Sequence, residues 1–531
     1  MLNFIKNLFT GRQNEGRTEN KDVNIAKNLD DNEKYIKTIF DKCSDIVIRK
    51  FNIANNPNYK AALIYIDGMI QQNIIEESII KRLTNKNADH TYNPGSEKYS
   101  KYLLGIKDED IYEKMDNAIE AILNGNPVLF INGISKALNV NLKNPPGRNI
   151  EEPTTETVVR GSREGFSESI RINTCLLRKK IKNVNLKMEC LKIGKQTKTD
   201  VVISYLANIA NHKIVNEVKE RLSKIDIDSV LDSNFIEEYI DDHPLSFFPT
   251  IFRTEKPDVA AGKLLEGRIA IIVDGTPTVL TVPAIFAEFI QTGEDYYMRF
   301  IPATLNRWLR YFSFFLSLTL PGFYVALVTF HQELVPTSLV VTIIKARAGV
   351  PLPSLWECFM MLLAYEILRE AGVRMPRAVG QAVSVVGALV LGQAAVEAGL
   401  VSTPMVIVTA LTGIASFTIP SPEMNMALTY PRFILLFLGG TLGILGLTCG
   451  LLIMLMNLIS MRSFGVPYMG PIVPLIMEEL PDIAIRAPLW STIRRPKLIT
   501  WKRDNRRQTI TRISSIKQEQ EKATQQKLKE K

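Results

Sequence analysis

The chain has 531 residues, of which 46% are hydrophobic and 22% are charged, and its formal net charge is +9. This average resembles that of a soluble protein, but residues 311–330 and 433–460 contain no charged residue, and residues 378–422 contain only Glu397. Uncharged stretches longer than roughly 18 residues are typical of membrane-spanning helices, so a purely soluble protein is excluded.

The N-terminal part of the chain is predicted to be a large cytosolic α/β region. Residues 1–35 are rich in Asn, Lys and Asp, which favours a flexible polar arm. Short apolar runs then alternate with amphipathic segments in two expected subdomains, residues 36–143 and 158–303. A proline-rich, acidic linker at residues 144–157 separates them. Because the N-terminus lacks a secretory signal, we expect this region in the cytoplasm.

The two predicted subdomains contain similar segments at nearly constant spacing. Residues 116–133 match residues 258–275 with an offset of 142, and both predict a helix, a glycine stop, a buried strand and a tight turn. Upstream, residues 63–83 match residues 202–222 with an offset of 139. The pattern predicts two copies of one α/β unit, with chance similarity of two helix–strand segments as the alternative.

A densely charged segment opens the second predicted subdomain. Arg and Glu alternate in residues 160–168, and a basic cluster follows at residues 178–180. Arg163, Glu164 and Arg178 are therefore candidates for ion pairs between subunits or domains. A solvated charged face is the alternative.

An α-helical membrane domain is predicted at residues 304–460. Its four expected spans are residues 308–330, 378–399, 401–420 and 432–459. The second and third follow each other directly and should form a tight helical hairpin. The last contains two Gly-xxx-Gly pairs, whose ordinary role is close packing of helix backbones.

The charges around the spans predict their orientation. Arg307 and Trp308 lie at the start of the first span, so the chain should enter the membrane from the cytoplasm. Four crossings return it there, with both termini inside. The tail, residues 461–531, carries eight Lys and Arg against one Asp within residues 494–512, which after a span favours membrane lipid over nucleic acid as its partner.

One apolar helix, residues 354–370, does not fit the pattern of a span. It contains Glu357, Glu366, Arg369 and Glu370. Because so many charges make a full crossing costly, we expect an interfacial or re-entrant position.

The sequence contains no recognisable catalytic or cofactor-binding motif. It has no phosphate-binding glycine loop, nucleophile elbow or zinc-protease helix, its four histidines are scattered, and its five cysteines form no CxxC pair. We therefore predict no catalytic residue, no metal site, no cofactor and no enzyme.

Polar residues inside the third predicted span are the strongest functional candidates. Ser402, Thr409, Thr412 and Ser416 recur at steps of seven, three and four, which places their hydroxyls on one helical face. They are candidates for lining a water-filled pore. Packing between helices is the alternative, because Ser and Thr are common at such contacts.

Two acids flank this span, Glu397 before it and Glu423 after it. If several copies surrounded an axis, each mouth of a pore would carry a ring of carboxylates that attracts cations. Four helices are too few to enclose such a pore, so a channel requires a homo-oligomer. Glu397 could instead hydrogen-bond to Gln393, four residues earlier on the same helix.

Several motifs together resemble one known family, the A subunits of bacterial spore germinant receptors. The resemblance covers roughly residues 155–490 and is carried by residues 160–180, TEKPD at 254–258, VDGTP at 273–277, LPGFYVALVTFH at 320–331 and SFGVPY at 463–468. Ser162 departs from the Gly-Pro that relatives usually have here. Stage V sporulation AF-like proteins share much of the pattern and stay an alternative.

The resemblance implies a subunit in the inner membrane of the spore, with a permease-like B subunit and a lipoprotein C subunit as partners. It also implies ring-shaped oligomers that open an ion path when nutrient binds. The leading hypothesis is therefore a nutrient-gated, oligomeric cation channel. The rival hypothesis is a scaffold that gathers the other subunits while ions move elsewhere.

Overall fold

The computed structural model describes residues 23–85, 93, 95–142, 153, 156, 158, 160–374, 392–488 and 495–500. Most of the predicted arm, linker and basic tail lies outside the described residues, as does most of the span predicted at 378–399. The chain divides into two compact units, residues 1–148 with 182–184 and residues 149–181 with 185–531, and each is described by itself.

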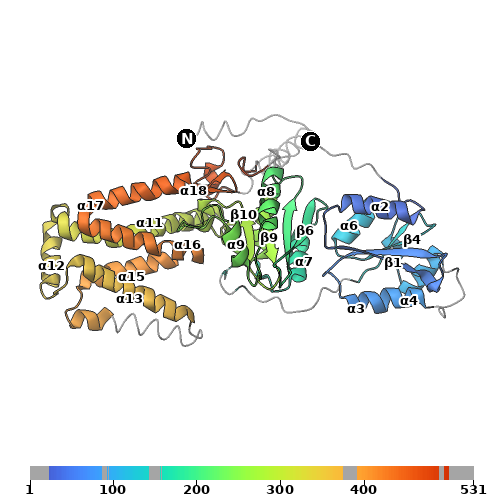
Figure 1. Ribbon diagram of the computed structural model, residues 1–531, viewed down its shortest axis with the longest axis horizontal. Coiled ribbons are helices and arrows are strands. Elements are labelled where there is room, and N and C mark those ends of the chain that lie inside the picture. Colours follow the sequence, from blue (N-terminus) through green and yellow to red (C-terminus); the bar gives the residue numbers. More distant parts are fainter. Residues whose placement is uncertain are drawn as a thin grey trace, which may run out of the picture. The chain divides into compact units, whose positions relative to one another are not determined.

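The first unit contains a five-stranded antiparallel sheet in the order β1-β2-β4-β5-β3. The strands are β1 Ile46–Asn52, β2 Lys60–Ile66, β3 Ile111–Tyr112, β4 Val128–Ile131 and β5 Ala137–Asn139. Figure 1 shows helices on both faces of this sheet. The helices of this unit are α2 Leu29–Ile39, α3 Gln72–Ile75, α4 Lys81–Thr84, α5 Glu97–Leu104 and α6 Met115–Leu123.

Helix α2 begins inside the stretch that was predicted as a flexible arm. The side chain of Asn28 caps the helix by accepting a hydrogen bond from the Asp30 backbone N–H, and Leu29 and Ile36 are buried. The polar composition therefore concealed a helix that two buried apolar residues, Leu29 and Ile36, attach to the core.

The second unit contains a sheet of the same kind, with strand order β6-β7-β9-β10-β8. Its strands are β6 Leu186–Ile193, β7 Thr199–Leu206, β8 Phe252–Thr254, β9 Ile269–Val273 and β10 Val279–Val282. One face packs with the apolar residues of α7 and α10, and the other packs with those of α8 and α9. These helices are α7 Ile170–Lys180, α8 His212–Ser223, α9 Ser233–Ile240 and α10 Pro257–Leu265.

The two sheets share their strand order and also a local hydrogen-bond pattern. The side-chain amide of Asn32 accepts from the Ala26 N–H and donates to the Ala26 carbonyl, at 2.9 and 2.7 Å. Asn173 does the same with Ser167, at 2.8 and 2.6 Å. Topology and these paired contacts agree with the predicted duplication of one α/β unit.

The predicted offset of 139 is correct for only part of the first matched segment. Leu63 pairs with Leu129 and Ile203 pairs with Ile271, so Leu63 corresponds to Ile203, where Val202 was predicted. A π-helical turn at Glu76–Ile80 then inserts one residue into the first copy. From there on the predicted alignment is restored.

The helical part of the second unit follows β10 in the chain. Its helices include α11 Phe300–Phe330, α12 Thr337–Arg347, α13 Ser354–Arg374, α15 Thr403–Phe417, α16 Pro422–Ala427, α17 Thr429–Ser460 and the short α18 Leu480–Ala484. Four spans were predicted, but among the described residues only two helical stretches are long and apolar enough to cross a membrane, Phe300–Phe330 and Pro422–Ser460. The third predicted span corresponds to α15, which has 15 residues and is shorter.

The last predicted span is a helical hairpin. Gly443 interrupts α17 with φ 66° and ψ −151°. A Cβ added at Gly450 would lie 2.7 Å from side-chain atoms of Leu435 and Leu438, which a straight helix would place roughly 20 Å away. The two halves of α17 therefore lie side by side, as Figure 1 shows. Residues 432–459 therefore form two helices that fold back on each other and not one straight helix, because the glycines allow a turn as well as packing.

Helices α13 and α15 run in the same direction. Ser402, at the start of α15, contacts Glu357 at the start of α13, and Ser416 near the end of α15 contacts Tyr365 further along α13. Parallel neighbours require the chain to return between them.

Candidate functional site

The four predicted pore-lining hydroxyls, called the hydroxyl stripe below, lie on one face of α15 as their spacing predicted. All four side chains are buried within the single chain, with relative exposures between 0 and 4% for Ser402, Thr409, Thr412 and Ser416. The opposite face of α15 carries the exposed side chains of Ile407, Ile414 and Phe417. The stripe therefore faces the neighbouring helices of its own chain, and pore lining stays a prediction.

Every hydroxyl of the stripe has a hydrogen-bond acceptor. Thr409 and Thr412 donate to backbone carbonyls three or four residues earlier in α15, at 2.7 to 3.0 Å. Ser416 donates to the Gly413 carbonyl at 2.7 Å and lies 2.9 Å from the Tyr365 hydroxyl. These contacts correspond to packing between helices, which was the alternative to pore lining.

Ser402 contacts Glu357, an acid that was not among the predicted site residues. Its backbone N–H and its hydroxyl both donate to Oε1 of Glu357, at 2.6 and 2.5 Å. Glu357 is fully buried, and its Oε2 lies 3.7 Å from Nε of Arg347 at the end of α12. The partners are far apart in sequence, so periodicity could not pair them.

A second charged cluster lies further along α13. Glu366 contacts Arg432 through Oε1 at 3.1 Å and Arg369 through Oε2 at 2.6 Å. Arg432 also donates from Nε to the Ser317 carbonyl at 2.8 Å. Helix α13 thus directs Glu357 and Glu366 toward partners on other helices of the chain. These partners explain how an apolar helix carries buried charges.

An apolar layer lies among the same helices. Its buried members come from α11, α13, α15 and α17 and are Val325, Cys358, Leu362, Met405 and Leu436. The interior of one chain is therefore packed here with apolar side chains rather than with a continuous row of polar groups.

The two predicted mouth acids have different surroundings. Glu397 is exposed and accepts a hydrogen bond from Gln393 at 2.9 Å, as the alternative interpretation proposed. Glu423 forms a 2.7 Å ion pair with Arg253 of β8, which also binds Glu237 of α9. Burial raises the pKa of Glu237, against the lowering effect of Arg253. Glu423 therefore ties α16 to the second sheet.

The three predicted inter-subunit residues have different surroundings. Glu164 pairs with Lys180 at 2.6 Å, and Arg163 is exposed. Arg178 is fully buried on α7. Their predicted role between subunits stays a prediction, and Arg178 could reach another chain only after local opening.

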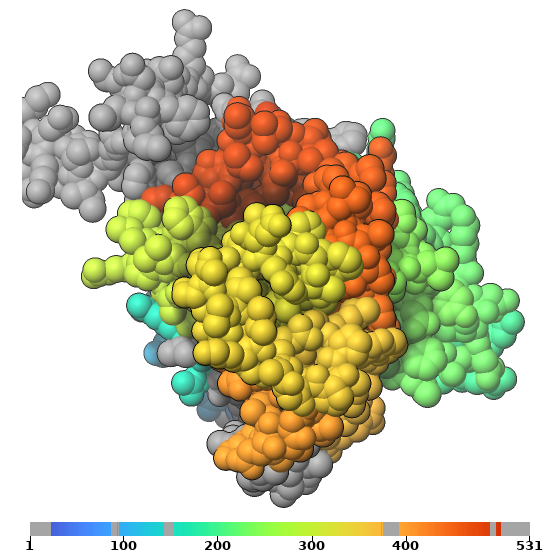
Figure 2. All heavy atoms as spheres, turned by 90° about the vertical axis from the view of Figure 1, so that its left-hand side faces the viewer, coloured from blue at the N-terminus to red at the C-terminus, as the bar shows by residue number. Residues whose placement is uncertain are grey.

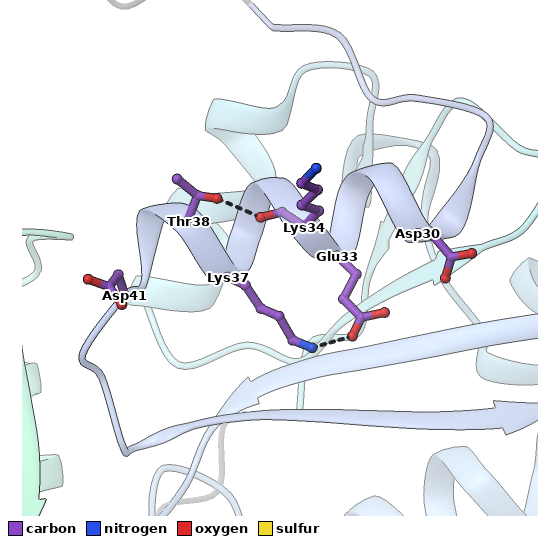
Figure 3. Close-up of a pocket in the computed structure, with 6 residues that line it drawn as sticks. All are labelled: Asp30, Glu33, Lys34, Lys37, Thr38 and Asp41. Atoms are coloured by element: carbon purple, nitrogen blue, oxygen red, sulfur yellow. Dashed lines mark hydrogen bonds and ion pairs between the residues drawn. The ribbon is translucent and has the colours of Figure 1, made fainter.

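Two surface features add no binding chemistry. A hollow of about 570 Å³ runs along α2 and is lined by residues of that helix and by Asp41, of which Glu33 and Lys37 pair with each other (Figure 3). This is a solvated helix face. Helix α12 has no buried residue and lies exposed at the end of the helical part (Figure 2).

Comparison with known proteins gives a consistent result. Residues 34–498 match the family model described as Bacillus/Clostridium GerA spore germination protein. The chain is 44% identical to the uncharacterized membrane protein YfkQ of Bacillus subtilis, over 90% of this chain and 92% of that protein. It is also 44% identical to spore germination protein KA of Bacillus subtilis, over 91% of this chain and 88% of that protein.

A solved structure matches the N-terminal half. It is the N-terminal domain of the A subunit of the Bacillus megaterium spore germinant receptor GerK3, with 36% sequence identity, 51% of this chain and 100% of that chain covered, and a TM-score of 0.39.

Proposed function

Because this chain belongs to the GerA spore germination protein family, we propose that it is the A-type subunit of a germinant receptor in the inner membrane of the spore. In this proposal it works with a permease-like B subunit and a lipoprotein C subunit. The family match across residues 34–498 is the observation that carries the assignment.

The stage V sporulation AF-like branch is the alternative within the family, and a strain lacking this chain distinguishes the two. Loss of the response to one nutrient supports a receptor subunit, whereas a general defect supports the other branch.

For the membrane topology we propose six crossings in place of four. Helix α11 leads away from the second sheet, α13 returns, and the parallel α15 requires an outward crossing between them, where a span was predicted at residues 378–399. The two halves of α17 supply the last pair. These halves and the 15-residue α15 are shorter than the roughly 20 residues of a full helical crossing, so this proposal needs a thin helical layer. Both termini and the two sheets then lie in the cytoplasm. Helix α13 can cross because Glu357 and Glu366 have partners inside the helical part.

For the activity we propose a nutrient-gated cation channel built from several copies of the chain. Because the described helices of one chain pack through an apolar layer, the proposed ion path lies between copies. The buried hydroxyl stripe would belong to the closed state and would reach water only when α15 moves. With such a movement, the stripe can be buried in the closed channel and still line the pore in the open one.

Cation release from single spores tests this activity. We expect Thr409→Leu to abolish early release after nutrient is added, because the larger side chain blocks the movement or the path. Thr441→Leu, at an exposed threonine of α17 with the same backbone hydrogen bond, should leave release unchanged. Co-purification with the other subunits checks assembly. Unchanged release in assembled Thr409→Leu receptors would reject the channel.

A scaffold is the second candidate function. It is favoured by one observation, that every hydroxyl of the stripe is satisfied within the single chain. Under this hypothesis, substitutions in the stripe change stability but leave cation release normal wherever the receptor assembles, and the charged segment around Glu164 matters for assembly.

A further inference from the structure

The cluster of Glu366, Arg369 and Arg432 holds more positive than negative charge. One carboxylate lies between two guanidinium groups, and each of its oxygens contacts one of them. Among the described residues no other acid forms an ion pair with either arginine. The cluster therefore carries a net charge of about +1 inside a helical part whose neighbouring residues are apolar, where an uncompensated charge is costly.

The same cluster has unused hydrogen-bond donors. Nη2 of Arg432 and Nη1 of Arg369 are both buried and have no hydrogen-bond partner among the described residues. Oε2 of Glu366 also lacks a partner of hydrogen-bond geometry, but it already faces Nη2 of Arg369 at 2.6 Å. Arg432 is completely inaccessible, while the Arg369 side chain is 18% exposed. Buried donors in native proteins almost always have a partner, so two on adjacent arginines indicate a missing acceptor. One negatively charged acceptor would satisfy both the donors and the charge.

We propose that a small monovalent anion, with chloride as the probe, binds at Arg369 and Arg432 inside the helical part. A guanidinium group offers its donors in a fixed planar arrangement and cannot lose its proton, so the pair is suited to hold an anion. A lipid phosphate would need access to Arg432, which the packing denies. The partly exposed Arg369 is the side from which the anion enters.

Thermal unfolding of the purified full-length chain in detergent tests this site. Chloride is titrated against gluconate at constant ionic strength, so that only the anion changes. We expect a saturable rise in the unfolding midpoint with chloride. Arg369→Gln should weaken the apparent chloride affinity by about tenfold or more. Glu366→Gln removes the competing negative charge and should strengthen it by about tenfold.

A matched control is available on the same helix. Arg374→Gln breaks an exposed ion pair with Glu370 and should leave the chloride dependence as in the native chain. The opposite changes expected at positions 366 and 369 separate a site from a general salt effect. The proposal is overturned if the midpoint does not depend on chloride, or if the dependence is the same in all variants. Should Arg369→Gln fail to fold, the Glu366→Gln result decides alone.

Discussion

Glu357 illustrates how a single buried acid can hold two helices together. Its carboxylate accepts both hydrogen bonds that Ser402 offers at the start of α15 and lies beside Arg347. Glu357→Ala leaves these donors without a partner, and we expect a loss of about 3 kcal/mol of stability. The exposed Glu370 on the same helix is the control, and Glu370→Ala should cost at most about 0.5 kcal/mol. Unfolding midpoints of the two purified variants compare them, and equal midpoints would contradict the assignment.

Asn173 has a comparable role in the second sheet. It is completely buried, and its amide makes both hydrogen bonds to the Ser167 backbone. Removing that amide in Asn173→Ala should destabilise the unit by about 2 kcal/mol, because the partly buried Ser167 N–H and carbonyl lose their partners. Asn216→Ala, at an exposed position of α8, should be neutral or slightly stabilising, since alanine favours helices. Denaturant unfolding followed by far-UV circular dichroism measures the free energy of unfolding of both variants. An Asn173→Ala variant as stable as the native chain would show that the two hydrogen bonds to Ser167 are dispensable.

At the scale of single residues, the sequence predicted which side chains share a face but not what that face contacts. The steps between Ser402, Thr409, Thr412 and Ser416 placed the stripe correctly on α15. Whether a polar face meets water or other helices depends on contacts with α11 and α13, which periodicity does not contain. Pairs such as Glu357 with Ser402 and Glu366 with Arg432 join distant parts of the chain, so no local pattern could reveal them.

The turn at Gly443 is the element on which the proposed topology depends most. Its positive φ is unfavourable for other residues, and an added Cβ would lie 2.7 Å from the His331 ring. Spin labels at the exposed Ile434 and Ile453 should report a distance far below the roughly 28 Å of a straight helix. Gly443→Leu should broaden or lengthen that distance, whereas Gly349→Ala, at an open position, should not change it. A distance near 28 Å in the native chain would refute the hairpin.

Helices and strands with a clear local sequence pattern were predicted well. Irregularities inside a helix, such as a π-helical turn or a hairpin turn, were not. Residues 116–133 and their copy at 258–275 each have a clear glycine stop and a buried apolar run. Each segment forms the predicted helix and strand, α6 with β4 and α10 with β9. The π-helical turn at Glu76–Ile80 adds one residue without any change in composition, which moved the predicted alignment by one position. Glycine pairs in α17 are compatible with packing and with a turn, and only the backbone angles of Gly443 decide between them.

At the scale of the whole molecule, the proposed channel requires several copies of the chain in one complex. Among the described residues, the helices of a single chain pack through an apolar layer, a buried hydroxyl stripe and two ion-pair clusters, and the exposed side of α15 is apolar. The water-filled path of the proposed channel would therefore lie between copies. A receptor with one copy could still act as a scaffold, but it could not conduct ions through this subunit.

The number of copies in the gently extracted receptor tests this requirement most directly. Native mass spectrometry of the complex, purified with its partner subunits in mild detergent or lipid nanodiscs, gives that number. We predict more than one copy of this chain in each complex. A complex that contains a single copy under every gentle extraction condition would contradict the channel and leave the scaffold as the function.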